Sequence, residues 1–309
     1  MFPGIPFPAI STVHAVLDRH DLVHGMKPRR YKAEGTLLSD PVKANNLWCC
    51  DYKGEFMLGN KQYCYLLTIT DSYSRYLLAC EGQESTKQGG AFAVFEAIFK
   101  EFGLPDAIRS DNGLPFSSPN ALHGLGKLSV WWLRLGIKIE RIKPGNPQQN
   151  GLPLRMHRTL KQETAKPAAF NLLQPQEKFD RFIKLYNNER PHQGIANKYP
   201  ADLYTPSTRV YKGLPDIDYH FAERIITVTK CGRICIGKRK INLSTVFAGQ
   251  NVGITQIDDT IWSVHFMDYV IGYFDTETSR VESSVDPFRI NLLPLSQVYT
   301  IINKFFDDR

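Results

Sequence analysis

The sequence contains no apolar stretch long enough to cross a membrane, since none approaches the roughly 18 residues that a bilayer span needs. Its first eight residues include three prolines and lack a basic start followed by an apolar run, so no signal peptide is expected. The six cysteines form no Cys-x-x-Cys pair, and no histidine completes a zinc-binding spacing. These absences argue against a membrane protein, a secreted disulfide scaffold and a structural zinc protein, and they favour a reducing cytoplasm.

The composition is that of a folded, basic protein. The 309 residues carry 38 Lys and Arg against 31 Asp and Glu, a net charge of +7. Hydrophobic residues make up 42% and charged residues 22%, which is enough to build a buried core. The length predicts two domains or three, and the basic excess is compatible with a nucleic-acid partner without proving one.

Four segments differ in pattern. Residues 1–24 hold one short helical pattern, with Val13, Val16 and Leu17 on its apolar side, and residues 25–45 form a basic linker that contains proline. Residues 46–205 alternate between strands and helices. Residues 213–300 read as short strands at close spacing, which predicts a small β-barrel or sandwich. The expected fold class is therefore α/β, followed by a small all-β domain.

Within the middle segment, three strands in succession predict an antiparallel meander at 47–51, 63–70 and 76–80. An amphipathic helix is expected over 88–102, with aromatic and aliphatic residues on one side. Further strands are expected at 107–110 and 138–142, and further helices at 152–166 and 177–186. Trp131 and Trp132 are expected to pack on the sheet rather than to stack on bases.

Two aspartates follow apolar strand residues. Asp51 ends the first strand, and Asp111 follows the strand at 107–110. Carboxylates at strand ends can meet over one edge of a sheet and hold Mg²⁺, which prefers oxygen ligands. Two such ions would activate a nucleophile at a phosphodiester and stabilise the leaving oxygen. Taken singly, each aspartate is as readily explained by a solvated strand end or an ordinary Asp-Asn-Gly turn.

A basic segment follows the second aspartate. A polar turn at 144–151 leads into a helix on which positions 154, 157, 158 and 161 share one face. Between residues 134 and 166 there are eight Lys and Arg and only two acids, so a phosphate backbone could lie along this stretch. An ordinary solvated helix face would explain the same pattern.

Taken together, six short motifs closely resemble the DDE transposases of bacterial insertion sequences and the retroviral integrases, which share an RNase H-like core. Each motif is weak alone, but they occur in the family's order over about half of the chain. They are WCCDYKG (48–54), TDSYSR (70–75), SDNG (110–113), PQQNG (147–151), MHRTLK (156–161) and YNNERPHQG (186–194).

The resemblance implies a division of the chain and a set of functional residues. Residues 1–24 would be the remnant of a helix-turn-helix, 46–205 the RNase H-like catalytic core, and 213–300 a small β-barrel. Asp51 and Asp111 would be the first two acids of the family's catalytic triad and would bind Mg²⁺ or Mn²⁺, with two ions expected in the family. DNA, as transposon ends and target, and further copies of the chain are the implied partners, with no membrane. The predicted DNA-binding residues are Lys143, Gln149, Asn150, Arg155, His157, Arg158 and Lys161.

The sequence departs from the family at its third acid, normally a Glu just before the Arg-x-His-Arg run. Here that position is Leu154, which cannot ligate a cation. Glu163 lies about 13.5 Å further along the helix and on the opposite side, and Glu140 lies on the preceding strand. One metal therefore loses a ligand.

Three functions remain open at this point. The chain is an active transposase, a DNA-binding remnant that is catalytically silent and able to interfere with intact copies, or an unrelated basic α/β protein. The joint motif match disfavours the third function, and the missing carboxylate favours an impaired or silent protein.

Overall fold

The computed structural model describes residues 35–118, 121–150, 173–276 and 280–284, with isolated positions at 13, 16–17, 19–20, 156–157 and 160. The chain divides into two compact units, Met1–Arg30 and Tyr31–Arg309. In the first unit, Val13, Val16, Leu17 and Arg19 are helical, and the three apolar side chains are exposed. The rest of the predicted helix-turn-helix remnant lies outside the described residues, so that prediction is not confirmed.

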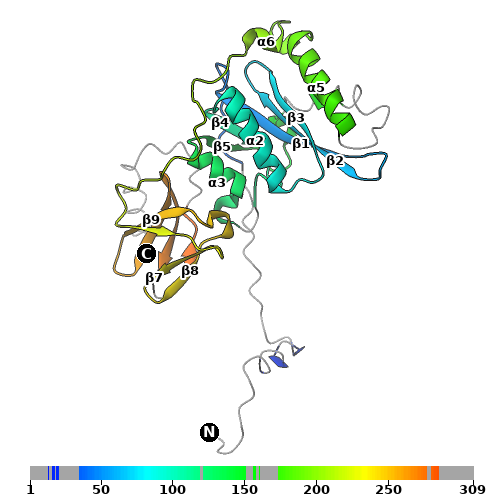
Figure 1. Ribbon diagram of the computed structural model, residues 1–309. Helices are drawn as coiled ribbons and strands as arrows, with labels where there is room; N and C mark the ends of the chain where they lie inside the picture. Colours follow the sequence, from blue (N-terminus) through cyan, green and yellow to red (C-terminus); the bar gives the residue numbers. More distant parts are fainter. Residues whose placement is uncertain are drawn as a thin grey trace, which may run out of the picture. The chain divides into compact units, whose positions relative to one another are not determined.

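The second unit begins with a mixed five-stranded sheet in the order β3-β2-β1-β4-β5 (Figure 1). Its strands are β1 (Leu47–Met57), β2 (Tyr63–Asp71), β3 (Leu77–Gln83), β4 (Ala107–Ser110) and β5 (Lys138–Arg141). The first three pair antiparallel, as the predicted meander requires, and β4 and β5 join in parallel. Strand β1 is longer than predicted, because its second half continues to pair with β2 beyond a register shift.

Two helices cover one face of this sheet. They are α2 (Gln88–Phe102), which has the predicted bounds, and α3 (Lys127–Arg134). Phe95 and Phe99 of α2 pack with Trp132 of α3 and with Trp48 of β1, and the rings of Phe95 and Trp132 meet edge to face. Trp132 is fully buried, which confirms that it packs on the sheet.

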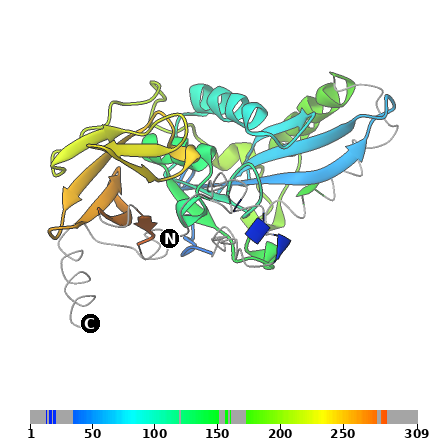
Figure 2. The same ribbon diagram turned by 90° about the horizontal axis from the view of Figure 1, so that it is seen from below.

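The opposite face is covered by α5 (Leu173–Asn188) (Figures 1 and 2). Its Phe179 and Phe182 pack with Leu66 and Leu77 of the sheet. Met156 and Leu160, which are helical, join the same buried cluster. The remainder of the helix predicted at 152–166 lies outside the described residues. A short helix, α6 (Pro200–Leu203), follows α5.

Side chains of α5 also bond to the outer edge of β3. Asn187 accepts a hydrogen bond from the Leu77 amide at 2.8 Å and donates to the Leu77 carbonyl at 3.0 Å. Gln176 accepts from the Gly82 amide and donates to the Cys80 carbonyl. The edge strand therefore finds partners for its backbone groups in a helix instead of a further strand.

A segment of extended chain, residues 35–40, lies along β5 at the other edge, and we call it the strap. The Thr36 amide donates to the Arg141 carbonyl at 2.9 Å, and the Arg141 amide donates to the Thr36 hydroxyl at 2.8 Å. The strap covers the open side of the last parallel strand.

The described residues of the C-terminal part form antiparallel strands and one 3₁₀ turn, η4 (Thr245–Phe247). One antiparallel sheet has the order β12-β11-β10-β9-β6, and a separate hairpin pairs β7 with β8. The hairpin contacts the two edge strands β6 and β12, but among the described residues hydrogen bonds do not close the sheet, so a closed barrel is not confirmed. The strands are β6 (Arg224–Thr227), β7 (Arg233–Ile236), β8 (Arg239–Asn242), β9 (Asn251–Gln256), β10 (Ile261–Phe266), β11 (Tyr269–Asp275) and β12 (Arg280–Glu282).

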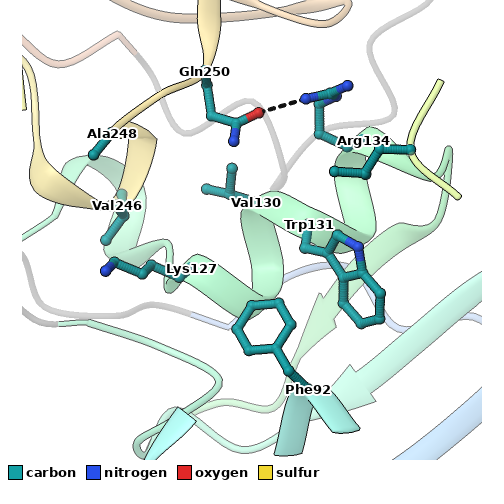
Figure 3. Close-up of a pocket in the computed structure, with 9 residues that line it drawn as sticks. Phe92, Lys127, Val130, Trp131, Arg134, Val246, Ala248 and Gln250 are labelled. Atoms are coloured by element: carbon teal, nitrogen blue, oxygen red, sulfur yellow. Dashed lines mark hydrogen bonds between the residues drawn. The ribbon is translucent and has the colours of Figure 1, made fainter. Parts of the chain in front are cut away.

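Helix α3 joins the two parts of this unit. Val130 and Leu133 on α3 share one buried cluster with Phe247, Val264 and Phe266 of the C-terminal part. Beside this cluster a cavity of about 250 Å³ opens between α2, α3 and the β-rich part, and there Arg134 donates to the side chain of Gln250 (Figure 3). Within the described residues, no helix is both long and apolar enough to span a bilayer.

Candidate active site

The parallel pairing of β1 and β4 brings the two predicted acids to equivalent positions. Cys49 of β1 lies opposite Arg109 of β4, and Asp51 and Asp111 each lie two residues further along. Side chains on a strand alternate between faces, and neighbouring strands lie about 4.8 Å apart. Asp51 and Asp111 therefore lie side by side on the sheet face that α5 covers.

Both carboxylates are partly withdrawn from solvent. The Asp51 side chain is 25% exposed. Burial raises the pKa of Asp111, and the Gly113 amide, which donates to its carboxylate at 3.1 Å, opposes part of that rise. The Cys50 thiol is fully buried on the opposite face of β1, in the cluster that contains Trp48, and burial raises its pKa.

A buried histidine lies behind Asp51. The His157 ring has no exposed surface, and its Nε2 lies 2.7 Å from the Thr68 hydroxyl while its Nδ1 lies 3.6 Å from the Asp51 carboxylate. Thr68 faces Asp51 across the β1–β2 pair and donates to its backbone carbonyl at 3.2 Å. His157 limits the orientations open to the Asp51 carboxylate, and the Thr68 hydroxyl holds the ring of His157 in place. Thr68 was not among the residues chosen from the sequence, since a lone threonine in an apolar strand gives no signal.

The other residues predicted to bind DNA differ in how exposed their side chains are, and some of them lie outside the described residues. Lys143 is exposed, Gln149 is half-buried, and Asn150 is buried and donates to the Cys50 carbonyl at 3.2 Å. Gln149 and Asn150 belong to a short 3₁₀ turn, η2 (Pro147–Asn150), which ends beside β1. Their contacts are internal, and the predicted role in DNA binding stays untested for them and for His157. Leu154, Arg155, Arg158 and Lys161 lie outside the described residues.

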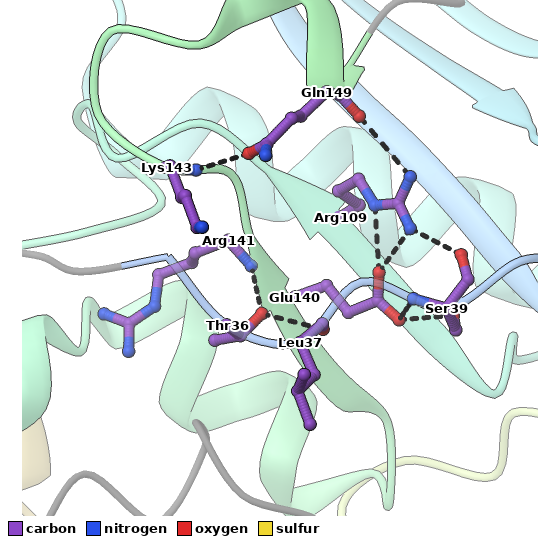
Figure 4. A network of polar contacts seen from close by, with 8 residues as sticks. All are labelled: Thr36, Leu37, Ser39, Arg109, Glu140, Arg141, Lys143 and Gln149. Atoms are coloured by element: carbon purple, nitrogen blue, oxygen red, sulfur yellow. Dashed lines mark hydrogen bonds and ion pairs between the residues drawn. The ribbon is translucent and has the colours of Figure 1, made fainter.

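Two other acids can be assigned to structural roles. Glu140 forms an ion pair with Arg109 at 2.7 Å and also accepts hydrogen bonds from the strap, so its carboxylate is occupied and does not replace the third acid (Figure 4). Asp71 is fully buried and accepts from the amides of Asn45 and Ser74 and from the Ser74 hydroxyl. Neither acid joins the Asp51 and Asp111 pair.

Part of the basic stretch is also internal. Arg141 is 2% exposed and donates to the His123 carbonyl at 2.6 Å. Arg134 donates to Gln250 and to the Pro215 carbonyl. These two guanidiniums hold the fold together, so the excess of basic residues in the sequence overstates the charge that is presented to a ligand.

The donor set formed by Asp51 and Asp111 suits a hard divalent cation. It consists of two neighbouring carboxylates in partly buried positions, one of them backed by a histidine. Among the described residues, no group of three or more acidic, histidine or cysteine side chains is suitably placed to hold a metal ion.

The middle of the chain matches models of known protein families. Residues 41–147 match a family model described as Integrase core domain, and residues 135–200 match a second model of the same description. The chain therefore carries a DDE-integrase-like core. Its bounds contain Asp51 and Asp111 and end near the α6 helix.

Retroviral polyproteins are among the relatives. The Gag-Pol polyprotein of baboon endogenous virus (strain M7) and the Pol polyprotein of feline endogenous virus ECE1 are each 36% identical over 104 residues, which is 34% of this chain. The Gag-Pol polyprotein of avian reticuloendotheliosis virus is 32% identical over 119 residues, or 38% of this chain. The matched stretch spans only 6%, 9% and 10% of those three polyproteins. An origin in a bacterial insertion sequence is not confirmed.

Solved structures give a more distant likeness. The HTLV-2 integrase catalytic core domain in complex with magnesium, in its trimeric form, is 16% identical and covers 54% of this chain and 100% of its own, with a TM-score of 0.41. The simian T-cell lymphotropic virus intasome in complex with PP2A regulatory subunit B56 gamma is 15% identical and covers 90% of this chain and 98% of its own, with a TM-score of 0.44.

Proposed function

We propose that this chain is an integrase- or transposase-type protein that binds DNA and acts on phosphodiester bonds beside the Asp51 and Asp111 carboxylates. The observation that carries the proposal is the register of β1 and β4, which gives Asp51 and Asp111 equivalent positions on one face. The integrase core domain match over the same strands supports it independently. Because the aligned relatives are much longer proteins, the activity, the DNA substrate and self-association into a multimer are all part of the proposal.

Each residue of the site has a defined task in this proposal. Asp51 and Asp111 would bind Mg²⁺ or Mn²⁺ through their carboxylate oxygens. The bound cation would supply a Lewis acid for the scissile phosphate and lower the pKa of the attacking hydroxyl. His157 lies against the Asp51 carboxylate and is itself held by the Thr68 hydroxyl, and exposed Lys143 would offer a cation to a phosphate.

The same proposal includes impaired catalysis. A pair of carboxylates provides fewer ligands than the family's three, and Leu154 offers no oxygen in place of the third. The chain is then expected to bind DNA and to react weakly or not at all, and a silent protein could compete with intact copies for DNA.

Restoring the missing acid tests this proposal. Leu154→Glu is expected to create or strongly raise strand transfer with Mn²⁺ or Mg²⁺ on end-containing DNA, and Asp51→Asn in that variant is expected to abolish it. Leu152→Glu supplies a matched control, since it adds the same charge two residues away. Activity that is equal in both glutamate variants, or that survives Asp51→Asn, would contradict the assigned site.

DNA binding can be measured without catalysis. Phosphate contacts release counterions, so affinity is expected to fall steeply between about 50 and 200 mM salt. Replacing Arg155, Arg158 and Lys161 together by Ala is expected to weaken binding to all sequences alike. Affinity that does not change with salt, or a loss confined to one sequence, would argue against phosphate contacts.

A further inference from the structure

Arg109 is the centre of a buried polar network that lies directly beside the two acids. It is 9% exposed and stands on β4 two residues before Asp111, on the same face of the strand. Opposite it on β5 is Glu140, which is 6% exposed. The arginine and glutamate thus form the row of side chains next to the row that holds Asp51 and Asp111.

The guanidinium of Arg109 reaches three different segments (Figure 4). Its Nε donates to the Glu140 carboxylate on β5 at 2.9 Å, and its Nη2 donates to the Ser39 carbonyl of the strap at 2.6 Å. Its Nη1 donates to the Gln149 carbonyl in η2 at 3.4 Å. Lysine has one ammonium in place of this fork and could not span the three acceptors.

The strap is held from both sides. Glu140 accepts hydrogen bonds from both the amide and the hydroxyl of Ser39. At its start, a Cβ added to Gly35 would lie 2.8 Å from the Lys143 amide nitrogen, so the strap packs directly on the chain that leaves β5. Lys143 in turn donates its amide to the Gln149 side chain at 2.8 Å.

The turn η2 carries these contacts to the acid pair. Asn150, next to Gln149, donates to the Cys50 carbonyl, and Cys50 precedes Asp51 in β1. Asn112, which follows Asp111, donates to the Ile142 carbonyl at the end of β5 at 2.6 Å. Both acids therefore have a neighbouring residue tied to the segment that runs from the end of β5 to η2.

We infer that Arg109 is a positioning residue, through which the strap holds η2 against β1 and so sets the spacing of the Asp51 and Asp111 carboxylates. This inference rests on the proposed function, since the spacing matters for the cation that the two acids would share. Partners that orient metal ligands from outside commonly change metal affinity by about 10- to 100-fold when they are replaced.

The test compares Arg109→Lys with the parent in the full chain, and it does not require catalysis. We expect Arg109→Lys to weaken Mn²⁺ binding, measured by the electron paramagnetic resonance signal of free Mn²⁺, by about 10-fold. We also expect faster amide hydrogen exchange at Lys143 and in η2. Glu140→Gln, which keeps a hydrogen-bond acceptor for Ser39, should weaken Mn²⁺ binding less than Arg109→Lys does. Arg233→Lys is the matched control, because the guanidinium of that exposed arginine in β7 donates, among the described contacts, only to the Asn242 side chain in β8.

Urea unfolding of each variant separates positioning from general stability. Weaker Mn²⁺ binding under conditions where Arg109→Lys is fully folded supports the inference, and unchanged binding and exchange overturn it. Asp51→Asn defines the Mn²⁺ signal that belongs to the site. If the parent and Asp51→Asn bind Mn²⁺ equally, the proposed metal function fails, and exchange in η2 alone then decides whether Arg109 holds the turn.

Discussion

Individual side chains show what parts of the sequence motifs do in the fold. In the stretch at 186–194, Asn187 is 1% exposed and bonds both backbone groups of Leu77, whereas the adjacent Asn188 is exposed and donates to a carbonyl of its own helix. Two neighbouring asparagines thus have different tasks. Within this motif, Asn187 attaches α5 to the edge strand β3.

Asn187→Ala is therefore expected to lower the free energy of unfolding by about 2 kcal/mol, because it leaves a buried amide and carbonyl without partners. Asn188→Ala, the matched control, should change it by less than about 0.5 kcal/mol. Urea titration followed by far-UV circular dichroism measures both. Equal effects in the two variants would show that the Leu77 bonds contribute little.

A second prediction at this scale concerns His265 in β10. Burial lowers its pKa from 6.5 to about 4, and it stays neutral against the Ser263 hydroxyl at 2.8 Å. Below pH 6.5 the unfolded chain takes up a proton that the folded chain refuses, so stability falls as the pH drops from 6.5 toward 4. The loss from this group is about 3 kcal/mol.

His265→Gln is expected to remove that part of the acid sensitivity. The free energy of unfolding of the parent should fall relative to the variant between pH 7 and 4, as measured by urea titration at each pH. His220→Gln, which changes an exposed side chain, serves as the control. A parent and variant that lose stability in parallel would contradict the burial argument.

Among the elements, those with strong local patterns were predicted well. The helix at 88–102 has the expected bounds, because its apolar residues recur at helical spacing and Gly103, at a φ of 77°, ends it. Strand β4 and the position of Asp111 just after it match the prediction, whereas Asp51 lies inside β1 and not at its end as predicted, because β1 continues to pair with β2 as far as Met57. The strap and the Arg109–Glu140 pair were not, because their partners lie 31 to 101 residues apart. The sequence signal for this pair was the presence of opposite charges, Arg109 and Glu140, on two otherwise apolar strands.

Two glycines with positive φ, Gly232 and Gly237, lie just before and just after β7. Gly232 has a φ of 75°, and an added Cβ would lie 2.4 Å from the backbone of Ser244 and Thr245. Gly237 has a φ of 57°, with nothing within 4 Å of its added Cβ. Gly237→Ala should cost about 1 kcal/mol of left-handed strain.

Gly232→Ala should lower the free energy of unfolding more than Gly237→Ala does. Both variants have the strain of a positive φ, and at position 232 the added Cβ also clashes with the backbone of Ser244 and Thr245. Thermal unfolding of the two variants measures the difference. If both alanine variants lose equal stability, Ser244 can move away at no cost, and the close approach is not a constraint.

At the scale of the whole molecule, α3 makes the integrase-like core and the C-terminal β part share buried residues. Val130 is 2% exposed and belongs to the cluster that contains Phe247 and Val264. Val130→Ala is expected to lower stability by about 1 to 3 kcal/mol and to shift a single unfolding transition as a whole. Hydrogen exchange by mass spectrometry checks this. Destabilisation of peptides from only one part would mean that the two parts unfold separately.

The two borders of the five-stranded core sheet have a consequence for how copies of this protein can associate. On β3 the amide side chains of Gln176 and Asn187 take the backbone groups, and on β5 the Thr36 backbone and hydroxyl do so. At these positions no hydrogen-bonding capacity is left for a foreign strand. Growth of the core sheet from one copy of the chain into the next is therefore blocked at these positions.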